Sequence, residues 1–241
     1  MCMFFSFVGD KAGNYHFFDW PARKQLLDMK KDENPDSHTY ILDRCGVSVD
    51  RHHHWSKYEF NPLTKAFYID EGVVGHDHGA AHRFALGLDF GLVVPALILK
   101  LIIHPFKDVI PPKKITKEHV ALVRQWASVR ASVRASVRAS VRASVGDSVG
   151  DSVWDSVWGS VWASVRDSVW DSVWDSVWDS VRDSMRDSMR AYISSFFNVE
   201  YQYDYSPIIK LWEMGLVPSF DGTTWRLHGG PDARVMWEGK V

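Results

Sequence analysis

Residues 127–190 read ASVR-ASVR-ASVR-ASVR-ASVG-DSVG-DSVW-DSVW-GSVW-ASVR-DSVW-DSVW-DSVW-DSVR-DSMR-DSMR. This stretch is an uninterrupted run of four-residue units. In each unit a small or acidic residue is followed by Ser, then by Val or Met, then by Arg, Trp or Gly. Such a repeat decides the fold, because the backbone must bury the same face at every fourth residue.

A single α-helix fits this period poorly. Four residues advance a helix by ~400°, so a Val at every fourth position drifts ~40° per unit and the stripe winds roughly twice around the axis. One straight helix would also be roughly 96 Å long at 1.5 Å per residue. Half of each unit is Ser and Val, which are mediocre helix formers.

An extended backbone fits the period better, because every Val then falls on one face. We therefore predict a tetrapeptide-repeat β-solenoid with Val pointing inward, whose stacked coils lie ~4.8 Å apart. The alternative is a set of broken α-helices. Two observations favour that alternative: Ala and Arg are good helix formers, and Ala often occupies the predicted corner, where Gly or Asn would tolerate a positive φ better.

The fourth position of the unit carries the variation, and on a solenoid it would project outward. Six exposed Trp side chains would be unusual for a monomer, and one interpretation is a flat aromatic platform that stacks on sugars, bases or another protein. The alternatives are a self-association face and Trp packed against the flanking domains. The candidate binding residues are Trp154, Trp158, Trp162, Trp170, Trp174, Trp178, Arg130, Arg134, Arg138 and Arg142.

The rest of the chain divides around the repeat. We predict an α+β domain over residues 1–110, a Pro-Pro connector with a capping helix over 111–126, the solenoid with its C-terminal cap over 127–197, and a small α+β segment over 198–241.

Local signals predict the elements of the flanking segments. Asp19 and Ser37 are typical helix caps. Strand-like alternation of apolar and polar residues on both sides of residues 61–64 predicts a hairpin. Residues 92–103 and 199–205 have the composition of strands, the first limited by Pro95.

The composition bounds the function. Apolar content is 46% and the formal net charge is −2, so no overall field favours nucleic acid or an acidic surface. Two cysteines are too few for a disulfide framework and fit a reducing compartment. Residues 1–8 lack a basic segment and a cleavage site, and the apolar run 90–99 is too short to span a bilayer. We expect a cytoplasmic protein that does not cross the membrane.

Several segments resemble uncharacterised proteins of bacteriophages and gut-bacterial prophages, and the likeness covers nearly the whole chain. Some related phage proteins carry a similar N-terminal domain before β-solenoid repeats, so the resemblance also implies a solenoid. It implies no settled activity. The segments that carry it are Met1-Cys2, Phe4 to Val8, Pro35 to His38, Lys57 to Thr64, the Ser-Val-Trp and Ser-Val-Arg units, and Leu211 to Gly222.

Cys2 is a weak candidate catalytic residue. Removal of Met1 would leave an N-terminal cysteine whose own amine could act as the base, as in N-terminal nucleophile hydrolases. The sequences of those enzymes begin with Met-Cys-Gly, whereas this sequence has Met3 in place of the Gly. The competing interpretation is a buried cysteine in the first strand.

Histidines are weak candidates for a metal site. On a helix starting near Asp77, His78 and His82 stand four residues apart, a spacing that can bind Zn²⁺, and His76 lies nearby. Residues 52–54 are a second histidine cluster. Surface histidines in loops are the commoner explanation, so we expect no metal and no cofactor.

We predict a non-enzymatic, phage-type interaction protein that presents the Trp and Arg columns to a protein partner or to another copy of itself. We expect a homo-oligomer, in the host cytoplasm if the chain is phage-encoded. One alternative is an enzyme of the N-terminal domain that uses Cys2 or a His-bound metal. The other is nucleic-acid binding through the Arg and Trp face, which the near-neutral charge disfavours.

Overall fold

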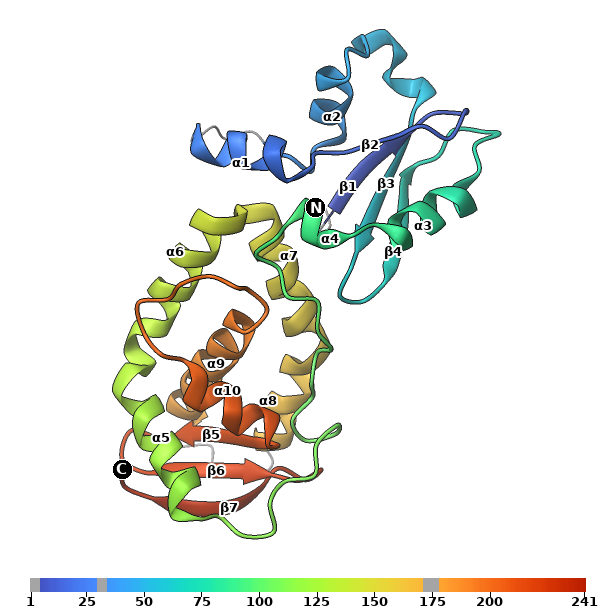
Figure 1. Cartoon of the computed structure of the whole chain (residues 1–241). Coiled ribbons are helices and arrows are strands. Elements are labelled where there is room, and N and C mark those ends of the chain that lie inside the picture. Colours follow the sequence, from blue (N-terminus) through green and yellow to red (C-terminus); the bar gives the residue numbers. More distant parts are fainter. Residues whose placement is uncertain (1–4, 30–33, 171–177) are drawn as a thin grey trace. The chain divides into compact units, whose positions relative to one another are not determined.

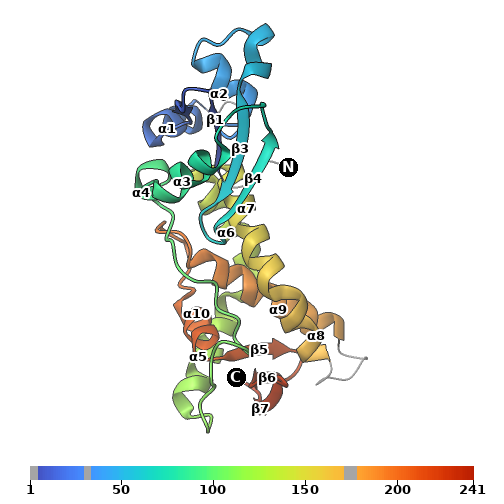
Figure 2. The same cartoon turned by 90° about the vertical axis from the view of Figure 1, so that its right-hand side faces the viewer.

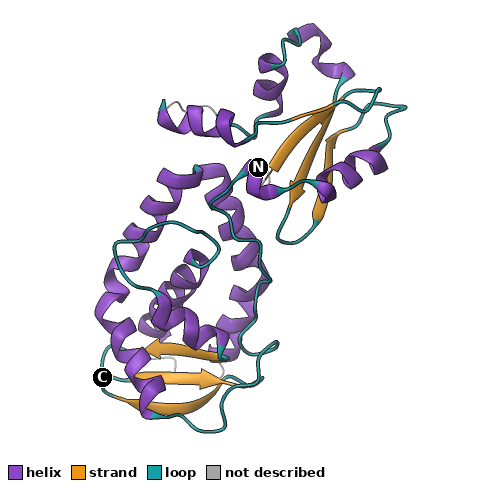
Figure 3. Cartoon of the chain, viewed as in Figure 1, coloured by secondary structure: helices purple, strands orange, loops and turns teal. Residues whose placement is uncertain are grey.

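The structure, a computed structural model, describes residues 5–29, 34–170 and 178–241 (Figure 1). Its strands form two small antiparallel sheets, and the remaining regular structure is helical (Figure 3). Among the described residues, no helix is both long enough and apolar enough to cross a lipid bilayer.

The chain divides into two units. The first combines Met1–Leu99 with Arg142–Val153, and the second combines Lys100–Val141 with Trp154–Val241. The repeat therefore contributes to both units.

The sheet of the first unit has the strand order β2-β1-β3-β4, and its neighbouring strands are antiparallel. β1 is buried along its whole length, as expected for a short apolar run. Asn61 Oδ1 accepts hydrogen bonds from the N–H groups of Leu63 and Thr64 and closes the predicted hairpin. The strands are β1 (Phe5–Gly9), β2 (Tyr15–His16), β3 (Ser56–Asn61) and β4 (Ala66–Glu71).

Two helices of the first unit, α1 and α2, begin at the predicted caps. Asp19 accepts a hydrogen bond from the N–H of Ala22, and Ser37 accepts one from the N–H of Tyr40. The helices are α1 (Trp20–Asp28), α2 (His38–Arg44), η1 (Val49–His54), α3 (His78–Gly87) and α4 (Phe90–Val93).

The second unit packs helices on its own sheet, whose strand order is β5-β6-β7. Helix α9 contacts β5, and α10 contacts α5, α9 and β5. The elements outside the repeat are α5 (Lys117–Val129), α10 (Ser206–Glu213), β5 (Leu216–Phe220), β6 (Trp225–Gly229) and β7 (Arg234–Gly239).

The repeat is helical in its described residues, so the β-solenoid prediction is wrong. Figure 2 shows the helices of the repeat from a second side. This arrangement corresponds to the alternative of broken helices. The segments are η2 (Arg130–Ser132), α6 (Val133–Val145), α7 (Asp147–Val157), η3 (Trp158–Trp162), α8 (Ala163–Trp170) and α9 (Trp178–Ser194).

Interruptions explain how helices can bury a four-residue period. The Val stripe drifts about 120° along the 13 residues of α6 and about 80° along the 11 residues of α7. A buried stripe roughly 100° wide or more accommodates that drift. Every described Val from Val133 to Val181 is accordingly at most 6% exposed. The objection to a helix holds only for one straight, continuous helix.

Two of the interruptions have a distinct backbone geometry. Gly146 separates α6 from α7 with a φ of 84°, a left-handed conformation that Gly adopts without a steric penalty. The turn η3 is π-helical. A π turn holds more residues than an α turn, so four residues fall short of a full rotation and partly reverse the drift.

Two predicted strands are absent from the described structure. Residues 199–205 form an irregular segment, in which Tyr201 Oη donates a 3.1 Å hydrogen bond to the carbonyl of Ser194 at the end of α9. Tyr201 therefore anchors this irregular segment to the end of α9. Residues 92–103 contain only the end of α4, a turn at residues 95–96 and irregular backbone with one bridge at Leu97.

Candidate interaction surface

Three tryptophans of the repeat stack along one side of α7 and η3. The ring centroids of Trp154 and Trp158 lie 5.1 Å apart, and those of Trp158 and Trp162 lie 4.4 Å apart. Residues four apart are neighbours on a helix surface, so the repeat itself produces this stack.

Arginines of α9 cover the stack. Arg186 Cζ lies 5.9 Å from the ring centroid of Trp162, and Arg190 Cζ lies 5.8 Å from that of Trp154. These are cation–π contacts. The order of the contacts shows that α9 runs antiparallel to α7 and η3. Trp162 is 6% exposed, and the other two stacked rings are half-buried.

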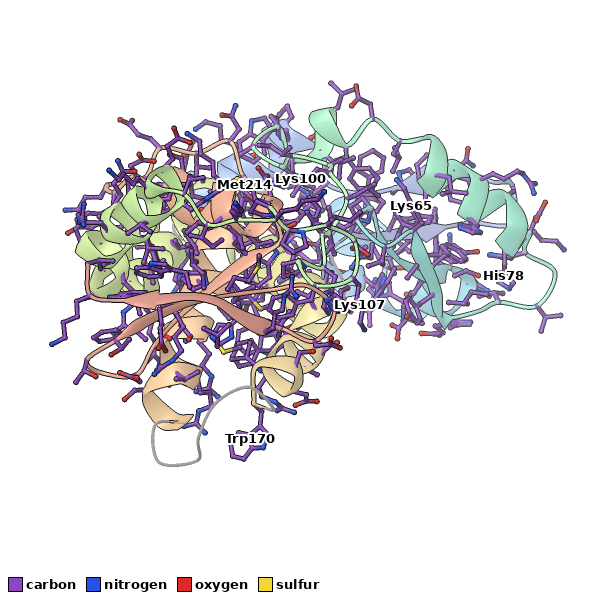
Figure 4. The ribbon with its side chains drawn as sticks, turned by 90° about the horizontal axis from the view of Figure 1, so that it is seen from below. Lys65, His78, Lys100, Lys107, Trp170 and Met214 are labelled. Atoms are coloured by element: carbon purple, nitrogen blue, oxygen red, sulfur yellow. The ribbon has the colours of Figure 1, made fainter. Side chains whose placement is uncertain are left out.

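The six tryptophans therefore do not share one outward face in the described structure. Trp170 is 41% exposed (Figure 4). Trp174 and the side chain of Trp178 lie outside the described residues. The outward column expected from a solenoid is thus replaced by a stack packed against the chain's own Arg column.

Arg130 is also engaged within the second unit. Its Nε lies 3.8 Å from Asp187 Oδ2, and its Cζ lies 5.5 Å from the ring centroid of Phe220. Arg190 donates a 2.8 Å hydrogen bond to the other oxygen of the same carboxylate. Burial raises the pKa of Asp187, and the two guanidinium groups partly offset this effect. Arg130 therefore helps to hold α9 in place.

Arg134 and Arg138 are different, because both side chains are exposed on α6. Within the part of the chain that the structure describes, neither has an ion-pair partner, whereas the exposed Arg142 lies 3.1 Å from Asp147. We call Arg134, Arg138 and Arg142 the Arg row. Exposed alanines flank it at residues 131, 135, 139 and 143.

A second charged row lies on α7, and the sequence analysis did not single it out. Asp147, Asp151 and Asp155 are exposed and stand four residues apart. We call them the Asp row. Asp151 and Asp155 have no ion-pair partner in the described structure. The signal was present in the sequence, since every unit from 147 to 158 begins with Asp.

The two rows belong to chain segments of opposite charge. Residues 113–146 contain eight Lys or Arg and one Glu, a net charge of +7. Residues 147–190 contain nine Asp and four Arg, a net charge of −5. The small overall charge of −2 conceals this separation.

The histidine candidates contact separate groups of the first unit. Ser56 Oγ lies 2.9 Å from His76 Nδ1, and Tyr58 Oη lies 3.0 Å from His78 Nδ1 (His78 is labelled in Figure 4). The ring of His82 stacks on an aromatic ring of β4. Burial, together with the neighbouring His78, lowers the pKa of His76. No group of three or more His, Cys, Asp or Glu among the described residues is arranged to hold a metal ion.

The other candidates add no reactive centre to the described structure. Cys2 lies outside the described residues. His52 Nε2 lies 3.3 Å from Asp43 Oδ1, and His53 and His54 are exposed.

A buried Ser–His pair was not among the candidates predicted from the sequence. Ser219 Oγ lies 2.7 Å from His228 Nε2, and the carbonyl of Ala233 lies 3.0 Å from His228 Nδ1. The carbonyl can only accept, so Nδ1 carries the proton and Ser219 donates to Nε2. Burial lowers the pKa of His228 to about 4. Both side chains are fully buried, so the pair supports the sheet and is closed to a substrate.

No family model, no curated protein and no solved structure matches this chain.

Proposed function

We propose that this chain is a non-enzymatic interaction protein that binds a protein partner through the charged rows of its repeat. The observation that carries the proposal is the exposure of Arg134 and Arg138 without ion-pair partners in the described structure. Surface cations are ordinary, but cations in register on one helix, flanked by alanines, form a regular surface.

Spacing is what makes the Arg row suitable for recognition. Successive Arg residues are separated by four residues, or about 6 Å along the helix axis. The flanking alanines allow another helix to approach closely, because interaxial distance depends on the side chains at the contact. One exposed ion pair contributes only about 0.2–1 kcal/mol, so binding requires several pairs in register.

The proposed binding residues follow from this geometry. The Arg row is the proposed contact surface, and the exposed Trp170 is a separate candidate, whereas the stack of Trp154, Trp158 and Trp162 packs against arginines of α9. Trp174 and Trp178 remain candidates. The resemblance to phage proteins and a cytoplasmic location belong to the same proposal.

A designed peptide tests the proposal. The ligand is an Ala-rich helical peptide with Glu at every fourth residue, and the control peptide has the same composition with its Glu residues clustered. We expect the full chain to bind the periodic peptide more tightly. R134E/R138E should weaken that binding by roughly 2- to 30-fold, as expected for two exposed ion pairs. Fluorescence anisotropy measures both affinities.

A matched variant and a second ligand make the test specific. K117E/R124E changes the charge equally at exposed sites outside the Arg row and should leave peptide binding unchanged. Equal binding of both peptides would contradict the proposal. Tight, salt-sensitive binding of a single-stranded oligonucleotide, with no binding of the peptide, would favour the nucleic-acid alternative.

A further inference from the structure

The Asp row is the complement of the Arg row within the same sequence. Both rows lie on helices and repeat every four residues, so successive charges are about 6 Å apart in each. Two rows with the same spacing can pair charge by charge over two successive residues, whether the helices meet parallel or antiparallel, because both rows also drift by the same ~40° per unit. A partner with unrelated spacing would match one charge and miss the next.

We propose that the partner of the Arg row is the Asp row of α7 in a second copy of this chain. This inference rests on the proposed function, because it names the partner of the same surface. Arg134 and Arg138 of one copy pair with Asp151 and Asp155 of the other. Within the described structure, these four exposed side chains have no ion pair of their own.

Charge complementarity favours a second copy over an unrelated protein. The segment that carries the Arg row has a net charge of +7, and the segment that carries the Asp row has a net charge of −5. Two copies that meet through opposite segments bring opposite charges together, whereas like segments repel.

Two of the sheet edges, β4 and β7, are poorer sites for association. β4 and β7 are edge strands, and the strand pairing shifts register at Asp70 in β4 and at Met236 in β7. Register shifts of this kind twist an edge away from a new strand. The helices of the repeat therefore offer a regular surface that the edges at β4 and β7 do not.

Charge-swap complementation tests the inference with full-length protein. Sedimentation equilibrium measures self-association of the wild type, of R134D/R138D and of D151R/D155R at low and high salt. We expect the wild type to associate and to dissociate as salt rises. Each variant carries like charges on both rows, so its self-association should be at least roughly tenfold weaker.

The decisive sample is the mixture of the two variants. The acidic α6 of one variant matches the basic α7 of the other, so the mixture should form a complex that neither variant forms alone. The variant K117D/R124D has the same charge change as R134D/R138D and should associate like the wild type. Far-UV circular dichroism checks that all variants are folded.

The outcomes separate this inference from the proposed function. A wild type that stays monomeric up to its solubility limit, or variants that fail to associate when mixed, overturns the second-copy inference. If that monomer still binds the periodic peptide through Arg134 and Arg138, the proposed function stands. If it binds neither peptide nor its own copy, both fail.

Discussion

At the scale of single residues, His228 shows how burial fixes a protonation state. Its ring is fully buried, with Ser219 on one nitrogen and the carbonyl of Ala233 on the other. A charged imidazole would lose its solvation there, so the pKa falls to about 4 from the usual 6.5. The neutral ring is therefore part of the folded second unit.

This environment predicts a loss of stability in acid. The unfolded chain takes up a proton at His228 below about pH 6.5, and the folded chain does so only near pH 4, so stability falls as pH drops through this window. The loss approaches about 3 kcal/mol by pH 4, at 1.36 kcal/mol per pKa unit. Urea denaturation at pH 7, 5.5 and 4 measures it.

A variant without the titrating group provides the comparison. We expect His228→Gln to be less stable than the wild type at pH 7 and to show a shallower pH dependence between pH 7 and pH 4. The exposed His53→Gln should keep the wild-type slope. Equal slopes for His228→Gln and the wild type would show that His228 titrates normally.

At the scale of elements, the glycines of the repeat should respond in opposite directions. Gly146 and Gly150 occupy the same position of neighbouring units, but only Gly146 has a positive φ. We expect Gly146→Ala to destabilise the fold by about 1–2 kcal/mol, since L-residues disfavour the left-handed region. Gly150→Ala should stabilise α7 by about 0.5–1 kcal/mol. Thermal and urea unfolding measure both changes in stability. If Gly146→Ala stabilised the fold as Gly150→Ala does, α6 would continue into α7.

Contacts between Trp and Arg should couple η3 to α9. Trp162→Ala removes a buried indole and should cost about 3–5 kcal/mol. Arg186→Ala should cost about 0.5–2 kcal/mol, and a double-mutant cycle should recover a coupling of similar size. The exposed Arg138→Ala should change stability by less than about 0.5 kcal/mol. Zero coupling between Trp162 and Arg186 would mean that the two residues do not interact.

Local chemistry made the short elements predictable. Asp19 and Ser37 cap helices through hydrogen bonds from residues that follow them closely in the chain, and Asn61 closes its hairpin in the same way.

The fold of the repeat was not predictable from such local hydrogen bonds. Its units are nearly identical, yet Ser184 is fully buried in α9 while Ser140 in α6 is half-buried. Tertiary contacts alone assign these different environments.

At the scale of the whole molecule, the candidate site was only partly predictable. The columns of Trp and Arg were visible in the sequence, but which column faces another helix depends on where the helices break. The net charge of −2 does not reveal the two segments of opposite charge, because their charges largely cancel in the sum. Arg130 and Arg134 occupy the same position of adjacent units, yet one lies over Phe220 and the other is exposed.

The breaks between helices also allow the number of four-residue units in the repeat to change. Four codons can be copied or lost in frame, and each such event lengthens or shortens one helix by about 6 Å and rotates the residues beyond it by ~40°. A rod without interruptions would pass that rotation on to every later contact. Here each loop or irregular turn can absorb it locally, so the number of charges in a row can change in single steps while the core keeps its shape.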